Sequence, residues 1–171
     1  MKTITQTFVL PCRVETVWKA YLDPAYVRAL YLDTLKYRAL DVLEVNETVR
    51  KMRVVPRLAL PGPIQKLVGD SFAYEDHGSL DRARNVWTWQ MVQPAQLAPG
   101  AKPKPGIVTT RGTVRVEAVG ERECRRTDEL VIEANVFGLG GLIESSAEKE
   151  ARAGWEIEIP MIRQWVTRLE G

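Results

Sequence analysis

A chain of 171 residues with a net charge of +2 fits one domain, residues 1–171, built around a single hydrophobic core. Its composition, 45% hydrophobic and 27% charged residues, is typical of a globular protein, and the small net charge does not indicate a polyanionic partner. No apolar run reaches the roughly 18 residues that a membrane helix needs. The first residues hold no apolar stretch of signal-peptide length, so we expect a cytoplasmic protein without stable membrane insertion.

Basic residues are densest in one short stretch, VRKMRVVPR, which holds Arg50, Lys51, Arg53 and Arg57. We interpret this stretch as a solvated strand face. We therefore expect no nucleic-acid partner.

Cys12 and Cys124 are too few for a disulfide framework, and neither has a second Cys or a His at metal-ligand spacing. We interpret both as reduced thiols that pack as small apolar groups. His77 is the only histidine, and no hydrolase signature is present. The sequence therefore predicts no metal and no cofactor.

The N-terminal region predicts one strand followed by two short helices. Residues 3–10 alternate between apolar and polar side chains, as a strand does. The period changes to that of a helix over residues 14–22, Asp23-Pro24 interrupts it, and Val27, Leu30 and Tyr31 resume it.

Strand patterns then dominate, over residues 37–45, 48–58, 71–80, 84–93, 107–119 and 123–136. No helix long enough for a parallel crossover separates them, so we expect antiparallel neighbours. Residues 60–70 contain two prolines and predict a short apolar turn, and residues 96–106, rich in Pro and Gly, predict a surface loop.

The chain ends in a long helical pattern, about 141–168, with a broad apolar face. Pro160 is expected to kink or split this helix. The order of elements is that of an α+β protein. It predicts a strongly curved antiparallel sheet of about seven strands wrapped around the C-terminal helix.

Three glycines, Gly138, Gly140 and Gly141, separate the last strand from this helix. A dinucleotide-binding loop needs a further strand after the helix, and a phosphate-binding loop needs a Lys and a hydroxyl at its end; neither is present. We expect the glycines to turn the chain back across the sheet and to leave Phe137 and Leu139 on a mobile loop.

This order, with LPCRVETVWKAYLDPAYV near the front and NVFGLGGLIE before the last helix, resembles the START-like helix-grip superfamily (SRPBCC) over nearly the whole chain. Residues 60–89 are similar to an uncharacterised START-like domain family and, more distantly, to PRELI-type phospholipid-transfer domains. The positions that carry this similarity are Leu60-Pro61, Ile64, Leu67, Gly69, Tyr74-Glu75 and Asp81.

The resemblance implies a cavity between the sheet and the C-terminal helix, closed by loops, that holds lipids, sterols, polyketides or other apolar molecules. Some relatives are aromatase/cyclase enzymes, and others act as chaperone cofactors. The fold alone therefore leaves the function open.

Aromatic side chains gather on one face of the predicted sheet. Trp87, Trp89 and Met91 share a face of one strand, and Phe72 and Tyr74 share a face of the strand before it. Such a stripe fits a packed core or the wall of a ligand cavity. The two differ in volume, because a packed core leaves few voids larger than water whereas a ligand site encloses roughly 300 to 1,000 Å³.

A charged pair lies on a later strand, where Arg126 and Asp128 share a face with Leu130 and Ile132. If the apolar residues point inward, the charged pair does too and could fix the polar head of a ligand. The alternative is that both charges are solvated beyond the buried part of the strand. Gly112, facing inward, would leave room opposite a bulky side chain or a ligand.

Alternation places His77 on the same face as Glu75 and Asp81, which makes it the polar face of the strand. We therefore expect His77 at the surface and not in a catalytic pair. On the last helix, Ala147, Ala151 and Gly154 allow close packing, whereas Ile157 and Met161 mark a wider end that would suit a ligand.

We expect a single helix-grip domain that binds or transports a small hydrophobic ligand, lipid, sterol or polyketide-like, in a cavity between the sheet and the C-terminal helix. A protein-interaction or chaperone-cofactor domain with a filled core is the alternative, and an aromatase/cyclase-like enzyme is the third candidate. The oligomeric state stays open. The candidate ligand-binding residues are Phe72, Tyr74, Trp87, Trp89, Met91, Gly112, Arg126, Asp128, Phe137, Leu139, Ile157 and Met161.

Overall fold

The computed structural model describes residues 1–57, 61–68, 72–92 and 108–171. Seven strands form one sheet in which every neighbouring pair is antiparallel, in the order β1-β7-β6-β5-β4-β3-β2. The strands are β1 (Lys2–Leu10), β2 (Ala39–Val45), β3 (Val49–Val55), β4 (Tyr74–Asp81), β5 (Val86–Val92), β6 (Val108–Gly120) and β7 (Glu123–Ala134). The predicted α+β class and the antiparallel sheet are confirmed. The loop expected over 96–106 lies outside the described residues, as do Leu60 and Gly69.

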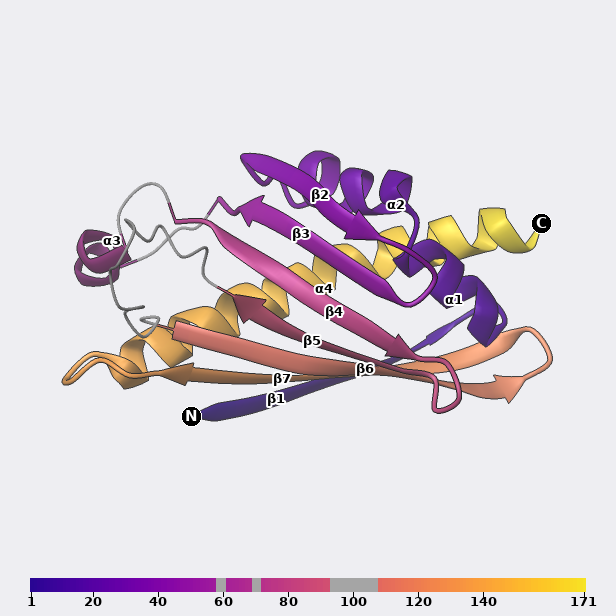
Figure 1. The fold of residues 1–171 in the computed structure, drawn as a ribbon. Coiled ribbons are helices and arrows are strands. Elements are labelled where there is room, and N and C mark those ends of the chain that lie inside the picture. Colours follow the sequence, from indigo (N-terminus) through magenta and orange to yellow (C-terminus); the bar gives the residue numbers. More distant parts are fainter. Residues whose placement is uncertain (58–60, 69–71, 93–107) are drawn as a thin grey trace.

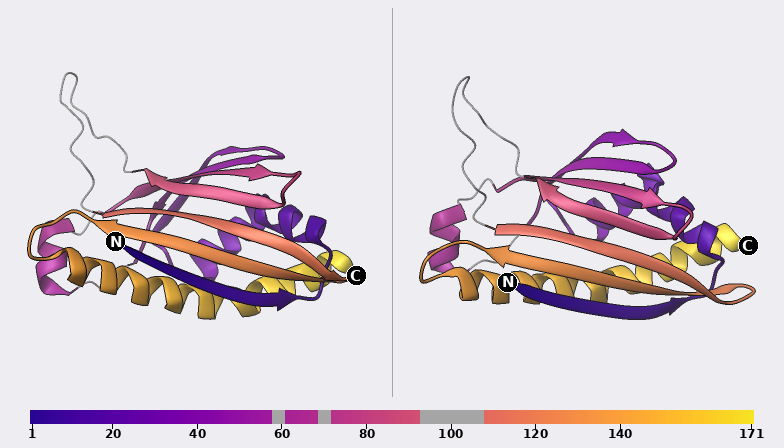
Figure 2. Two further views of the ribbon diagram at one scale, coloured as in Figure 1. Left: turned by 90° about the horizontal axis from the view of Figure 1, so that it is seen from below. Right: turned by 60° about the horizontal axis from the view of Figure 1, so that its bottom comes forward.

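One long helix, α4 (Gly140–Glu170), runs along a single face of the curved sheet (Figures 1 and 2). It is continuous over 31 residues, so of the two expected effects of Pro160, a kink or a split, the split does not occur. Pro160 removes one backbone N–H from the helix. Its side chain and that of Glu156, four residues earlier, are both exposed, so water can satisfy the carbonyl that loses its partner. Buried Ile162 and Val166 hold the following turns against the core.

The two short helices predicted after β1 are α1 (Val14–Tyr21) and α2 (Pro24–Arg28). Asp23 begins α2 by accepting a hydrogen bond from the backbone N–H of Ala25 at 2.8 Å, and Pro24 follows in the first turn, where its missing N–H costs nothing. The chain then continues as a π-helix, η1 (Ala29–Thr34), which the sequence pattern did not predict.

A further helix, α3 (Gly62–Val68), occupies the segment for which we expected an apolar turn. That prediction is wrong because prolines are tolerated in the first turn of a helix, where Pro63 lies. Ile64 anchors the helix, with only 1% of its surface exposed.

The glycine-containing turn between β7 and α4 reverses the chain, as predicted. Gly138 adopts a positive φ of 73°, which glycine tolerates without strain. A side chain at Gly140 would meet the carbonyl oxygen of Ala134 at 2.9 Å. The turn therefore needs these glycines for its geometry, without a bound phosphate.

The core has two parts. The larger part lies where α1, α2 and the C-terminal half of α4 meet the sheet, and it includes Leu10, Trp18, Tyr26 and Trp87. The smaller part consists of Ile4, Leu130 and Ile132, against which Ala147, Ala151 and Trp155 of α4 pack. None of the helices in the described part of the chain is long and apolar enough to cross a membrane.

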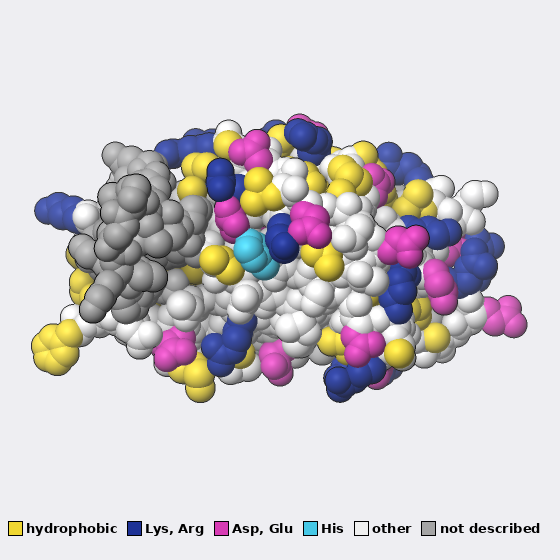
Figure 3. Space-filling model, viewed as in Figure 1, with side chains coloured by type: hydrophobic (Ala, Val, Ile, Leu, Met, Phe, Trp, Pro, Cys, Tyr) yellow, Lys and Arg dark blue, Asp and Glu magenta, His cyan; other side chains and the backbone are white. Residues whose placement is uncertain are grey.

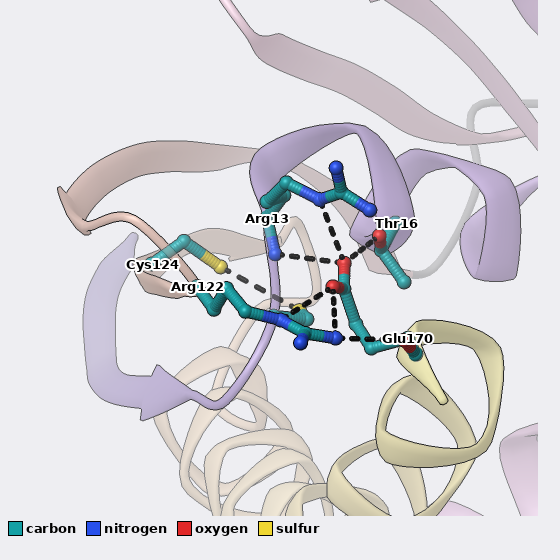
Figure 4. Close-up of polar contacts among 6 residues, drawn as sticks. Arg13, Thr16, Arg122, Cys124 and Glu170 are labelled. Carbon is teal, nitrogen blue, oxygen red and sulfur yellow. Dashed lines mark hydrogen bonds and ion pairs between the residues drawn. The ribbon is translucent and has the colours of Figure 1, made fainter.

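Glu170 ties the end of α4 to the start of α1 (Figure 4). Its carboxylate accepts hydrogen bonds from the Arg13 backbone N–H at 3.1 Å, from the Thr16 hydroxyl, and from Arg122 at 3.2 and 3.3 Å. Arg13 precedes α1 and provides no side-chain cap itself. Glu170 therefore caps α1 from a distant part of the chain.

We expect Glu170→Gln to lower stability at neutral pH and to flatten its acid dependence. The hydrogen bonds from Thr16 and Arg13 lower the pKa of Glu170 from 4.5 to about 2. A depressed carboxyl pKa adds stability above the unfolded-state value, and this stability is lost as pH falls from about 4.5 to about 2. Urea unfolding at a series of pH values measures the effect. Glu121→Gln, at an exposed position next to Arg122 in the sequence, is the control. If Glu170→Gln kept the wild-type dependence of stability on pH, the assignment would be contradicted.

Candidate functional site

Two adjoining cavities lie between the sheet and α4. The first, of about 240 Å³, has mostly apolar walls; the second, of about 310 Å³, contains charged groups. Tyr37, Tyr74, Trp89, Leu130, Glu150 and Ala151 line both. The cavities therefore meet along the middle of α4. Together they form one partly open space between the sheet and the helix, with an apolar end and a polar end.

Trp89 stands in the centre of the sheet wall between two glycines. The register pairs it with Gly78 of β4 and with Gly112 of β6. A side chain at Gly112 would meet the carbonyl oxygen of Glu129 at 2.4 Å and the indole nitrogen of Trp89 at 2.9 Å. Gly112 thus leaves room for a bulky side chain, as the sequence suggested. The group that fills this room is Trp89 itself.

Arg126 holds two carboxylates in the second cavity. Its Nε and Nη2 donate to the two oxygens of Asp128 at 2.7 and 2.8 Å, and its Nη1 donates to Glu158 at 2.7 Å. Only 2% of the Arg126 side chain is exposed, with 5% for Asp128 and 15% for Glu158. Burial acts to lower the pKa of Arg126, but Asp128 and Glu158 outweigh it and raise that pKa well above its ordinary value. The alternative that Arg126 and Asp128 are solvated is wrong.

Three tyrosines and a buried carboxyl group line the second cavity together. Tyr31, Tyr37, Tyr74 and Asp76 all line the second cavity, and the Tyr31 and Tyr37 rings pack edge to face at 5.2 Å. Burial raises the pKa of each tyrosine. The phenols therefore stay protonated near neutral pH and can donate hydrogen bonds.

Asp76 is the residue that our candidate set missed. Strand alternation places it on the face of Tyr74 and Leu80, and this inner face is the buried one. Burial raises its pKa, and Arg50 opposes the shift. Arg50 itself is 3% exposed and stacks on Tyr21, so it does not belong to the solvated basic face expected from the sequence.

Seven of the twelve candidates line the cavities. Phe72, Tyr74, Trp89 and Met91 line the first. Arg126, Asp128 and Ile157 line the second.

The other five are not among the described residues that line the two cavities. Trp87 is fully buried in the core, where its ring covers Gly78. Gly112 faces Trp89, and Met161 packs on the core and accepts a hydrogen bond from Thr34. Phe137 is fully exposed and Leu139 is half-buried, both in the turn before α4.

His77 lies on the outer face of β4, as expected, where its Nε2 is 2.8 Å from Glu75. The chain's single histidine is visible on that face in Figure 3, and it does not line either cavity. The paired carboxylate of Glu75 also binds Arg53 at 2.7 Å. This outer cluster belongs to the solvent side of the sheet.

Comparison with known proteins identifies the family. The model of a family described as "Protein of unknown function (DUF2505)" matches residues 5–166. The chain belongs to the DUF2505 family. No curated protein matches it at a significant level.

Solved structures show that this DUF2505 protein has a START-like helix-grip fold. TTHA0849 from Thermus thermophilus is 15% identical, with a TM-score of 0.69 over 99% of this chain and 100% of that one. The Zhui aromatase/cyclase from Streptomyces sp. R1128 is 17% identical, with a TM-score of 0.65 over 98% and 94%. A START superfamily protein from Mycobacterium smegmatis is 12% identical, with a TM-score of 0.56 over 98% of each chain. At these identities the likeness concerns the fold alone.

Proposed function

We propose that this DUF2505 protein binds a small hydrophobic ligand in the space between the sheet and α4. The observation that carries the proposal is the pair of adjoining, partly open cavities, of about 240 and 310 Å³, between the sheet and α4. A core that served stability alone would leave few voids of this size, because protein interiors are packed like organic crystals. The cavities therefore favour ligand binding over the protein-binding alternative, which rests on a filled core.

The first cavity provides the affinity in this proposal. Phe72, Trp89 and Met91 from the sheet side and Ala147 and Ala151 from α4 line it. Each Å² of apolar ligand surface removed from water contributes about 25 cal/mol. A ligand that buries about 300 Å² there would gain roughly 7 kcal/mol before the cost of association is subtracted.

Ala151 offers a direct test, because it lines both cavities from the helix. Ala151→Leu fills part of the space without weakening the helix, since leucine is a strong helix former. We expect this change to weaken binding of the neutral reporter N-phenyl-1-naphthylamine by about ten-fold or more, measured by its fluorescence. Lys149→Leu, on the exposed side of the same helix, is the matched control and should leave the affinity unchanged.

Native mass spectrometry of the purified protein, followed by extraction, would then identify the natural ligand. The proposal is wrong if wild-type protein shows no saturable binding of the reporter. It also fails if both variants bind as wild type does, because binding would then occur outside the cavities.

An enzyme of the aromatase/cyclase kind is the second candidate. The observation in its favour is that carboxyl groups, Asp76 and Asp128, line the cavity, where a bound molecule would meet them. The Zhui protein is described as an aromatase/cyclase, and the two share a fold. Because Asp128 is held by Arg126, Asp76 is the group more available for proton transfer.

A further inference from the structure

The second cavity contains two kinds of buried carboxylate. Both oxygens of Asp128 accept hydrogen bonds from Arg126. Asp76 is 8% exposed, and its Oδ1 has no hydrogen-bond partner. A buried carboxylate oxygen without a partner is costly, because it has lost the hydrogen bonds that water provided.

The groups around Asp76 balance its charge but leave that oxygen unpaired. Arg50 of β3 is its diagonal neighbour on the inner face, since the register pairs Met52 with Asp76 and Arg50 with Gly78. The Nη1 of Arg50 donates to the carbonyl of Tyr21 at 2.6 Å, and its guanidinium stacks on the rings of Tyr21 and Trp87. Arg50 therefore supplies a nearby positive charge, while its Nε and the Oδ1 of Asp76 both lack a hydrogen-bond partner.

The Oδ1 of Asp76 is covered in the structure, and a rotation of the carboxylate group would turn it toward the cavity. Asp76 lines the second cavity, and Tyr37 and Tyr74, which line both cavities, lie close enough to interact with it electrostatically. A molecule whose apolar body fills the first cavity would bring its polar end to this junction. An ionised carboxylate only accepts hydrogen bonds, so the matching ligand group is a donor.

The charged residues that line the second cavity indicate whether the donor group of the ligand is neutral or charged. Glu150, Glu158 and Asp128 also line the second cavity, and Arg126 is already bonded to two of them. Of two further cations, Arg50 does not line the cavity and Arg57 lines it from an exposed position. A ligand carboxylate beside Asp76 would therefore meet the charges of Asp76 and Glu150. A neutral hydroxyl would meet no such repulsion.

We propose that Asp76 is the polar anchor of the ligand site and accepts a hydrogen bond from a ligand hydroxyl. The inference rests on the proposed function and narrows its ligand class to apolar alcohols and phenols, against fatty-acid-type carboxylates. In this proposal, the phenol groups of Tyr37 and Tyr74 are the other polar groups beside that hydroxyl.

The first test varies the ligand and leaves the protein unchanged. 2-Naphthol, 2-methoxynaphthalene and 2-naphthoate share one ring system and differ in the polar group: a donor, a blocked donor and an anion. We expect wild-type protein near neutral pH to bind 2-naphthol about ten-fold or more tightly than either analogue, measured by isothermal titration calorimetry. Equal affinities for 2-naphthol and 2-methoxynaphthalene, or a preference for 2-naphthoate, would overturn the assignment.

The second test varies Asp76. Asp76→Asn keeps the shape of the side chain and weakens the acceptor by removing its charge. It should reduce the preference for 2-naphthol over 2-methoxynaphthalene to about two- or three-fold, while 2-methoxynaphthalene binds as it does to wild type. Glu75→Gln, the next residue but on the outer face of β4, is the control and should keep the full preference.

The two proposals fail in different ways. If N-phenyl-1-naphthylamine and 2-methoxynaphthalene bind but the hydroxyl brings no advantage, the cavity binds ligands and Asp76 is satisfied by water alone. If none of the probes binds to wild-type protein, both proposals are wrong. A 2-naphthol preference that survives Asp76→Asn would assign the hydroxyl to another group and reject Asp76 as the anchor.

Discussion

Arg126→Met is expected to reduce the free energy of unfolding by about 3 to 5 kcal/mol, because it leaves two buried carboxylates without their partner. Asp128 loses both of its hydrogen bonds from Arg126, and Glu158 loses the one at 2.7 Å. Methionine keeps much of the length of the arginine stem, so the lost charge and not a new cavity dominates the effect. Equilibrium unfolding in guanidinium chloride measures the change.

Arg125→Met is the matched control on the same strand, since that side chain points to the exposed face of β7. We expect its effect to stay within about 0.5 kcal/mol. A triple variant, Arg126→Met with Asp128→Leu and Glu158→Leu, should recover most of the loss, because replacing a complete buried ion group with apolar side chains is often neutral. If Arg126→Met alone cost less than about 1 kcal/mol, the group would not be desolvated as described.

Gly78→Ala should also be strongly destabilising, by about 2 to 4 kcal/mol, because the added methyl group collides with Trp87. A side chain at Gly78 would approach the Trp87 ring atoms Cζ2 and Cε2 to 2.1 and 2.3 Å. Trp87 is fully buried and packs edge to face on Tyr21 at 5.4 Å, so its ring has little space into which it could move. Urea unfolding, with near-ultraviolet circular dichroism as a probe of tryptophan packing, measures the loss.

Gly154→Ala on α4 is the control with the opposite expected sign. No atom lies within 4 Å of a side chain added there, and alanine favours a helix over glycine by about 1 kcal/mol. We expect this variant to be slightly more stable than wild type. A Gly78→Ala protein with wild-type stability would show that the tryptophan is not fixed over β4.

The strands could be predicted well from the sequence because one face of each is buried. Residues such as Met52, Val54, Leu80 and Trp87 alternate with exposed ones, and that period of two marks both the strands and their inward faces. The short helical segments were harder. The prolines around Ile64 suggested a turn although they begin α3, and Pro160 suggested a break in a helix whose packing keeps it continuous.

The sequence predicted which strand side chains point inward, but not which of them fill the core and which line a cavity. Alternation correctly directed Tyr74, Trp89, Arg126 and Asp128 inward. It could not tell that Trp87, two residues before Trp89, fills the core while Trp89 lines a cavity, because that difference depends on which helix lies opposite. Asp76 shares the inward face too, but a charge on a strand does not by itself indicate a buried position.

The strand order imposes a sequence of events on folding. β1 contains Lys2–Leu10 and pairs with β7, which contains Glu123–Ala134, so the first strand of the sheet cannot pair until the last one has been synthesised. Contacts between such distant segments slow folding, because the intervening loop must close first. Until β7 is made, β1 has no neighbour in the sheet, and α4 lacks part of the surface on which it packs. Pairing of β1 and docking of α4 are therefore late steps in the folding of this domain.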